Sequence, residues 1–180
     1  QHGRPCFYAG CMKGAEVAAW KQVARGELAD TSPQLEYVGV LFDLVKAFER
    51  VPLAWLARQA CKYDYPIVVL RLCIAAYQLL RTIGVDGVYT SLMQAVRGIT
   101  AGSVTATIEL RVLLIEFLDD TTMLFPRAIF TVYVDDTGIE AVGSSARVKR
   151  DVVGVAMHFT KALTDIGMEW SSTKSLVSAS

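Results

Sequence analysis

The sequence predicts an α+β fold whose core is an antiparallel sheet of the split βαβ, or ferredoxin-like, type, with helices packed on one face. Residues 36–43 are rich in β-formers and predict a strand. Two further apolar arms, residues 127–132 and 137–142, flank a short acidic turn and predict a hairpin. From Val148 to Ile166, apolar side chains recur at steps of three and four, as on the buried face of a helix. The order strand, helix, strand, strand, helix, strand is that of a split βαβ unit.

Helices and turns account for most of the remaining chain. Residues 12–29 predict a helix that ends before the turn at residues 30–33. Because proline is favoured at helix starts, Pro52 and Pro66 each predict a helix as well. The remaining predicted elements are helices over residues 53–63, 66–80 and 103–118, a hairpin within 85–96, and a last strand pair at 168–170 and 175–178.

The side of the last helix opposite its apolar face is charged. A charged helix face is usually solvated, so we expect it to lie in water and not to form a binding patch. Its residues are Lys149, Arg150, Asp151, Lys161 and Asp165.

The acidic turn is the most informative feature of the chain. In Tyr133-Val134-Asp135-Asp136, two adjacent carboxylates repel each other unless solvent or a cation lies between them. Aspartate is common in turns, so an ordinary solvated turn is one interpretation. The other is that a hard divalent cation binds the carboxylate oxygens.

A third acid, Asp43, ends the strand predicted over residues 36–43. If that strand pairs beside the hairpin, Asp43 and Asp135 meet at one edge of the sheet. Two cations about 4 Å apart at such a site activate a hydroxyl nucleophile and stabilise the leaving oxygen of a phosphoryl displacement. All-oxygen octahedral sites suit magnesium.

Four sequence blocks, in this order, resemble those of reverse transcriptases, specifically the enzymes of non-LTR retrotransposons. The resemblance covers nearly the whole chain, residues 1–178, although residues 1–30 match only loosely. The blocks are Phe42-Asp-Leu-Val-Lys-Ala-Phe-Glu-Arg-Val-Pro52, Gly98-Ile-Thr-Ala-Gly-Ser103, Tyr133-Val-Asp-Asp136 and Ile166-Gly-Met-Glu-Trp-Ser-Ser-Thr-Lys174. The family's polymerase palm has the split βαβ scaffold. The resemblance therefore implies RNA-templated DNA synthesis, in which a primer 3′-OH attacks a deoxynucleotide (dNTP).

The resemblance also implies roles for residues around the acidic turn. Asp43 and Asp135 would hold two Mg²⁺ (or Mn²⁺) ions, with Asp136 beside them near the primer end. Phe48 is similar in position to the aromatic ring that excludes a ribose 2′-OH, although a core aromatic is the other interpretation. Tyr133 would support the primer end, or it is simply a strand aromatic.

The resemblance assigns the other two blocks to the pyrophosphate and the template. Lys174 would protonate or screen the departing pyrophosphate, unless it is an ordinary surface lysine. Gly98 and Gly102 flank a loop before a predicted helix, and backbone N–H groups there would face a template or an incoming phosphate. In the plainer interpretation the glycines form a turn, and Ser103 is the N-cap of the helix.

Two departures from the family pattern keep other functions open. Ala101 stands where most reverse transcriptases have Gln, and Ala106-Thr107 replaces the usual Ser-Pro. They favour an alternative in which a degenerate, non-catalytic palm serves as a binding or structural domain. A viral RNA-directed RNA polymerase shares the palm and is the third hypothesis, although Phe48 argues against it.

Length and composition predict one domain that is part of a larger protein. The chain has 180 residues, of which 53% are apolar, and some apolar surface should therefore be covered by chain outside this sequence. By resemblance, residues 1–35 form a helical segment on the fingers side and 36–180 the palm, while the rest of the fingers and the thumb are missing. We therefore expect the isolated fragment to be inactive. The expected partners are an RNA template, a DNA primer, dNTP and the remainder of its own polyprotein, including an endonuclease if one is attached.

Net charge, cysteine spacing and hydropathy restrict the partners and the cellular compartment that we expect for this chain. A formal net charge of zero predicts weak binding of nucleic acid by this chain alone. The four cysteines form no C-x-x-C pair, which argues against a structural zinc site and suits a reducing, intracellular compartment, nucleus or cytoplasm. Charged or polar residues interrupt every long apolar run, so no membrane partner is expected.

Overall fold

The computed structural model describes residues 4–8 and 14–179, in two compact units. The first unit comprises Gln1–Val45 and Leu114–Ser180, and the second comprises Lys46–Leu113. The divisions fall after Val45 and after Leu113. The boundary at residue 35 between a fingers-side segment and the palm stays a prediction. Each unit is described by itself below.

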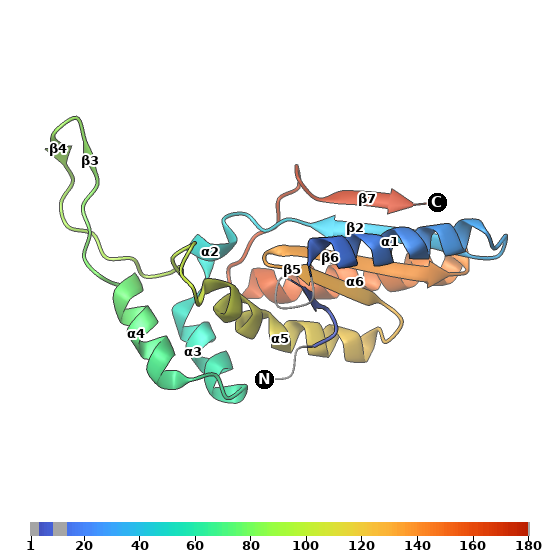
Figure 1. Cartoon of the computed structure of the whole chain (residues 1–180), viewed down its shortest axis with the longest axis horizontal. Helices are drawn as coiled ribbons and strands as arrows, with labels where there is room; N and C mark the ends of the chain where they lie inside the picture. The colour runs from blue at the N-terminus through green and yellow to red at the C-terminus, as the bar shows by residue number, and fades with distance from the viewer. Residues whose placement is uncertain (1–3, 9–13, 180) are drawn as a thin grey trace. The chain divides into compact units, whose positions relative to one another are not determined.

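A five-stranded sheet forms the centre of the first unit, in the order β1-β5-β6-β2-β7 (Figure 1). The last four strands pair antiparallel in the order of a split βαβ unit, and β1 adds a parallel strand beside β5. The predicted α+β, ferredoxin-like fold class is therefore confirmed, with β1 as an addition. The strands are β1 (Phe7–Tyr8), β2 (Glu36–Phe42), β5 (Ile129–Tyr133), β6 (Asp136–Gly143) and β7 (Leu176–Ala179).

Helix α6 (Ser145–Asp165) covers one face of this sheet. Its Val148 and Val152 pack with Val40 of β2 and Ala141 of β6 in one buried cluster. The apolar series predicted from the sequence is thus confirmed as the buried face of a helix. The prediction of a solvated charged face is wrong for Asp151. This residue lies three positions after Val148, on the buried side of the helix. Its carboxylate accepts hydrogen bonds of 3.1 Å from the guanidinium of its neighbour Arg150.

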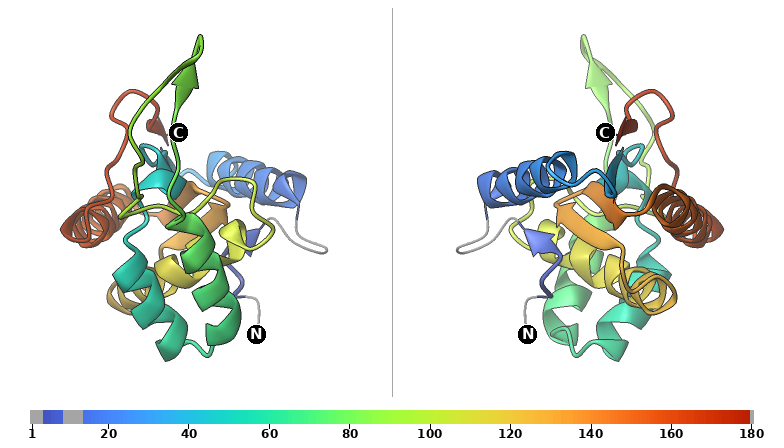
Figure 2. Two further views of the ribbon diagram at one scale, coloured as in Figure 1. Left: turned by 90° about the vertical axis from the view of Figure 1, so that its left-hand side faces the viewer. Right: turned by 90° about the vertical axis from the view of Figure 1, so that its right-hand side faces the viewer.

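Helix α1 (Ala15–Asp30) lies on the opposite face of the sheet (Figure 2). Its Arg25 pairs with the buried Glu140 of β6, which also accepts a 3.0 Å hydrogen bond from the hydroxyl of Tyr37 in β2. Helices therefore contact both faces of the sheet, where the sequence predicted one. The helix predicted over residues 12–29 is confirmed from Ala15 onward, and residues 12 and 13 lie outside the described residues.

The predicted strand at residues 168–170 is wrong. Only Trp170 pairs there, in an isolated bridge with Leu44. The segment instead turns at residues 171–174 before β7, which confirms the second strand of that predicted pair with a shift of one residue.

The second unit is mainly helical. Helices α3 (Leu53–Lys62) and α4 (Ile67–Tyr77) contact each other and confirm the helices predicted after Pro52 and Pro66. The other elements are α2 (Ala47–Arg50) and a hairpin of two short strands, β3 (Gly84–Val85) and β4 (Val88–Tyr89). Within the described ranges, every helix of the chain is too short or too polar to span a bilayer.

Helix α5 (Ala106–Leu124) begins later than predicted. The N–H of Ser103 donates to the carbonyl of Thr100 at 3.0 Å in a preceding turn, and helical bonding starts only with the N–H of Glu109 donating to Thr105 at 2.9 Å. Ser103 therefore stands outside the helix, and the N-cap prediction for it is wrong.

Candidate active site

Asp43 and the acidic hairpin turn lie at the same edge of the sheet. Phe42, the last residue of β2, pairs with Thr137 of β6, and Tyr133 pairs with Asp136 across the hairpin. Asp43 follows Phe42 as Asp136 precedes Thr137, so one more step of the antiparallel register aligns the two acids. Residues opposite each other in such a ladder share a face of the sheet. The structure therefore brings Asp43 and Asp136 together from distant parts of the sequence.

The three carboxylates influence one another electrostatically. Desolvation is the largest cause that raises the pKa of Asp136 above its ordinary value, although the residue as a whole is exposed. The carboxylates of Asp135 and Asp43 raise this pKa further, whereas the ammonium of Lys174 lowers it. Like charges thus accumulate at this edge, where a cation would be stabilised.

Lys174 supplies one positive charge at the site. Its Nζ lies 3.7 Å from Oδ2 of Asp43, and its side chain is 71% exposed compared with 22% for that of Asp43. Lys174 of the fourth sequence block therefore lies beside Asp43 of the first, and its role toward pyrophosphate stays a prediction. The pairing alone stabilises the fold little, because exposed ion pairs are screened by solvent.

The hairpin turn consists of Val134 and Asp135, and Val134 has a left-handed backbone with φ of 59°. A β-branched residue is strained in this region, at a cost of about 1–3 kcal/mol. Tyr133, just before it, is 37% exposed and pairs with Tyr8 of β1. Strain of this kind is concentrated at functional turns, which supports a role for the turn beyond chain reversal.

Two serines that sequence analysis missed hold the backbone of Asp43. The N–H of Ser171 donates to the carbonyl of Asp43 at 2.9 Å, and the N–H of Asp43 donates to Oγ of Ser175 at 3.4 Å. Ser171 lies within the fourth block and Ser175 directly after it, and their only sequence signal was the polar run around Lys174.

The other predicted site residues lie in the second unit. Phe48 is half-buried in α2, and its carbonyl accepts a 2.8 Å hydrogen bond from the N–H of Ile99. The N–H of Gly98 donates to the carbonyl of Val51 at 2.8 Å. These two N–H groups of the glycine block are therefore already bonded within the protein. Contact of this loop with a template or an incoming phosphate stays a prediction.

The rest of the glycine block adopts turn geometry. Gly102 has φ of 86°, a conformation that favours glycine. The Oγ of Ser103 accepts a long hydrogen bond, 3.5 Å, from the N–H of Thr105. The turn interpretation is thus confirmed for this loop, and template contact by Gly102 or Ser103 stays a prediction.

Whether a divalent metal ion can bind here depends on which ligand atoms the predicted site residues offer. Asp43, Asp135 and Asp136 offer only carboxylate oxygens, the ligands that Mg²⁺ and Mn²⁺ prefer. Among residues 4–8 and 14–179, however, no three His, Cys, Asp or Glu side chains are arranged so that they could hold a metal ion together. The chemistry of the donors fits a divalent ion, and binding it requires the carboxylates to turn toward one another.

The chain is similar in structure to telomerase. Over 96% of its length it matches telomerase from Candida albicans in complex with a TWJ fragment of telomeric RNA, with a TM-score of 0.70 and 14% sequence identity. Over 97% of its length it matches apo telomerase from Candida tropicalis truncated from the C-terminal domain, with a TM-score of 0.67 and 12% identity. The chain spans 32% and 36% of those two proteins, respectively.

No family model and no curated protein matches the sequence. At 12–14% identity, the structural likeness is evidence of fold alone. The chain thus has an α+β fold shared with about a third of telomerase.

Proposed function

We propose that this chain is the catalytic palm of an RNA-directed DNA polymerase. The observation that carries the proposal is the meeting of Asp43 with Asp135 and Asp136 at one sheet edge, where the carboxylates of the first two raise the pKa of the third. Three acids from two distant parts of the sequence are costly to gather unless a cation or substrate uses them.

The fold supports this proposal at the level of the reaction class. Telomerase is a reverse transcriptase-type catalytic protein, and the Candida albicans structure contains telomeric RNA. The four sequence blocks support the narrower assignment to a non-LTR retrotransposon type. An RNA template, a DNA primer and a dNTP are accordingly the partners that we propose.

Asp43, Asp135 and Asp136 would hold two Mg²⁺ or Mn²⁺ ions. When bound, such ions stabilise the charge that develops on the attacking and leaving oxygens. Lys174, beside Asp43, would then donate a proton to the departing pyrophosphate or screen its charge. Phe48 would exclude the 2′-OH of ribonucleotides, an assignment that rests on the sequence resemblance alone.

The direct test is primer extension on an RNA template by the longest protein that contains this chain. Asp135→Asn should lower the extension rate at least about a hundredfold, because catalysis here depends mostly on charge stabilisation and positioning. The matched control is Asp165→Asn, since Asp165 is an exposed acid of α6 that pairs with Lys161. Equal rates for wild type and Asp135→Asn would refute the proposal.

A degenerate palm without catalytic activity is the second candidate. The occupied N–H groups of Gly98 and Ile99 favour it, together with Ala101 in place of the usual Gln. Titration of Mn²⁺ into the chain separates the two candidates. An absence of metal-dependent stabilisation, together with an inactive full-length protein, would support the degenerate palm.

A further inference from the structure

We infer that residues 169–175 form a clamp that positions Asp43 and Lys174 as one unit, with Ser171 and Ser175 as its positioning residues. The inference rests on the proposed function, because it assigns both serines to the same site. It also adds a role for side chains that neither the sequence blocks nor the fold comparison assigns.

Asp43 needs such support because both strand ladders end before it. Pairing of β2 with β6 ends at Phe42 and Thr137, and pairing of β2 with β7 ends at Leu41 and Leu176. Asp43 thus lies beyond the last pair on either side of β2. Another part of the chain must therefore fix its backbone.

Residues 169–175 supply the missing hydrogen bonds. The N–H of Ser171 donates to the carbonyl of Asp43 at 2.9 Å, and the N–H of Asp43 donates to Oγ of Ser175 at 3.4 Å. Two residues further along, the N–H of Val45 donates to the carbonyl of Glu169 at 2.9 Å. The backbone is thus held at Asp43 itself and immediately after it.

The same serines also fix Lys174. Oγ of Ser175 donates to the carbonyl of Ser171 at 2.7 Å, and Oγ of Ser171 accepts a 3.2 Å hydrogen bond from the N–H of Lys174. The turn therefore closes on itself while it holds Asp43 and the backbone of Lys174, whose Nζ lies 3.7 Å from Oδ2 of Asp43. The hydroxyl of Ser175 both accepts from the N–H of Asp43 and helps to close the turn, together with the N–H of Ser175, which donates to the carbonyl of Ser171 at 3.0 Å.

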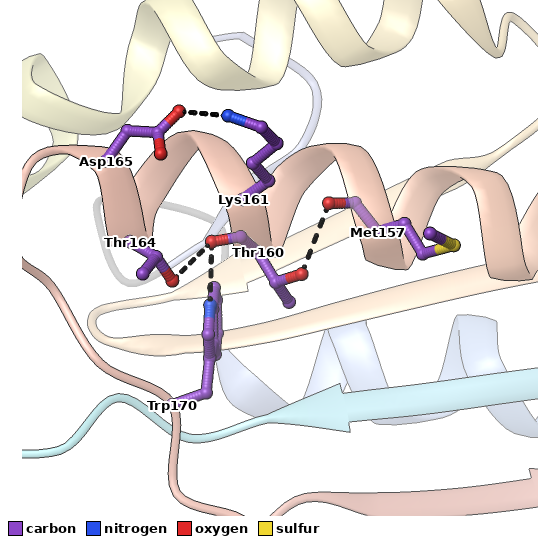
Figure 3. Close-up of polar contacts among 6 residues, drawn as sticks. All are labelled: Met157, Thr160, Lys161, Thr164, Asp165 and Trp170. Atoms are coloured by element: carbon purple, nitrogen blue, oxygen red, sulfur yellow. Dashed lines mark hydrogen bonds and ion pairs between the residues drawn. The ribbon is translucent and has the colours of Figure 1, made fainter.

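Trp170 anchors this clamp to the rest of the first unit. Its ring meets Phe42 edge to face at 4.8 Å between centroids and Phe159 of α6 at 5.7 Å. Figure 3 shows the indole pointing to α6, where Nε1 donates to the carbonyl of Thr160 at 3.4 Å. The same carbonyl accepts a 2.8 Å bond from Oγ1 of Thr164. The clamp is therefore tied to β2 through Phe42 and to α6 through the indole.

Loss of the Ser175 hydroxyl should therefore displace Asp43 and Lys174 while the core remains folded. Misplacement of a reacting group by about 1 Å costs up to about a hundredfold in rate. Ser175→Ala removes the hydroxyl, Ser175→Thr keeps it as the conservative variant, and Ser172→Ala is the matched control. Ser172 is exposed in the same turn and takes no part in the hydrogen bonds to Asp43 and Lys174 described above.

The first measurement is hydrogen exchange of backbone amides in the chain without metal. In Ser175→Ala, the amides of Asp43 and Ser171 should exchange at least about tenfold faster, while the amides of β6 keep their protection and show that the sheet is intact. Ser175→Thr and Ser172→Ala should exchange as the wild type does. Unchanged exchange at Asp43 in Ser175→Ala would overturn the clamp.

The second measurement is extension by a single nucleotide in the longest protein that contains the chain. Ser175→Ala should lower kcat about tenfold or more with little change in KM for the dNTP, and Ser175→Thr should restore kcat. Faster exchange at Asp43 with an unchanged kcat would overturn the positioning role and leave the proposed function standing. If the wild-type protein extends no primer, the proposed function is refuted, and so is the role of Ser175 in positioning Asp43 for catalysis. The hydrogen-exchange data would still decide whether the clamp holds the backbone of Asp43.

Discussion

The ammonium nitrogen of Lys174 lies 3.7 Å from Oδ2 of Asp43, so a fixed positive charge stands beside a carboxylate that we propose as a metal ligand. A divalent ion about 6 Å from this charge is repelled by roughly 1.4 kcal/mol even in water, or about tenfold in affinity. We expect Lys174→Gln to tighten Mn²⁺ binding to the chain by up to about tenfold. Isothermal titration at low salt measures the change.

Lys161→Gln is the control for this prediction. Lys161 is equally exposed and forms its own ion pair, 2.6 Å from Oδ2 of Asp165 on α6. Its loss should leave Mn²⁺ affinity unchanged. Weaker binding by Lys174→Gln would contradict the electrostatic account.

Asp136 should make the fold less stable as the pH rises above its unfolded pKa. Its folded pKa is raised above 3.8, so between the two pKa values the folded chain holds a proton that the unfolded chain has released. Stability falls across that window and stays lower at higher pH. In chelator, Asp136→Asn should therefore be more stable than wild type at pH 7 and nearly equal to it at about pH 3. Urea unfolding at both pH values measures this, and an equal difference at both would refute it.

Glu140 should be the acid whose loss destabilises the first unit most. It is buried, pairs with Arg25 and accepts a hydrogen bond from Tyr37, whose pKa burial raises to about 12. Glu140→Gln leaves the half-buried Arg25 without its counter-charge and should cost about 3 kcal/mol. Tyr37→Phe should cost about 1 kcal/mol, and Glu27→Gln, on the exposed side of α1, less than about 0.5 kcal/mol. A difference below 1 kcal/mol between Glu140→Gln and Glu27→Gln in denaturant unfolding would disprove the ranking.

Two glycines of the same loop should differ sharply when replaced by alanine. A Cβ on Gly98, which has φ of 93°, would lie 2.7 Å from the carbonyl oxygen of Glu49, and Gly98→Ala should cost more than about 2 kcal/mol. Gly102 also has a positive φ, of 86°, but its Cβ would meet nothing within 4 Å, and Gly102→Ala should cost about 1 kcal/mol. Thermal unfolding of the two variants measures the difference. Equal losses of stability in the two variants would mean that backbone strain, and not the contact with Glu49, determines the cost of replacing these glycines.

The sequence predicts the elements of the sheet well because their signals are local. A run of β-formers predicted the strand that Asp43 directly follows, and the flanking apolar arms predicted Asp135 in the turn between β5 and β6. The spacing from Val148 onward gave the buried face of α6. Each signal depends only on residues within one element.

The same local patterns do not predict contacts between segments that are distant in the sequence. Ser171 and Ser175 look like ordinary turn residues, and their bonds to Asp43 appear only once β2 and the end of the chain lie side by side. Asp151 lies on the buried stripe of α6 by its position in the helix, but its charge suggested solvent. Ser103 is a favoured N-cap type, yet its backbone is committed to the preceding turn. In each case a tertiary contact or a competing turn outweighed the residue's usual preference.

The register of β2 determines the order in which this chain can acquire its structure during synthesis. Glu36 pairs with Gly143 and Phe42 with Thr137, so β2 leaves the ribosome about 100 residues before its partner β6. At roughly 5–20 residues per second, its edges stay unpaired for several seconds. The helices of Lys46–Leu113 contain mostly local contacts and have time to form first. Nascent β2 is therefore exposed to premature association, and chaperone capture is expected there before the sheet closes.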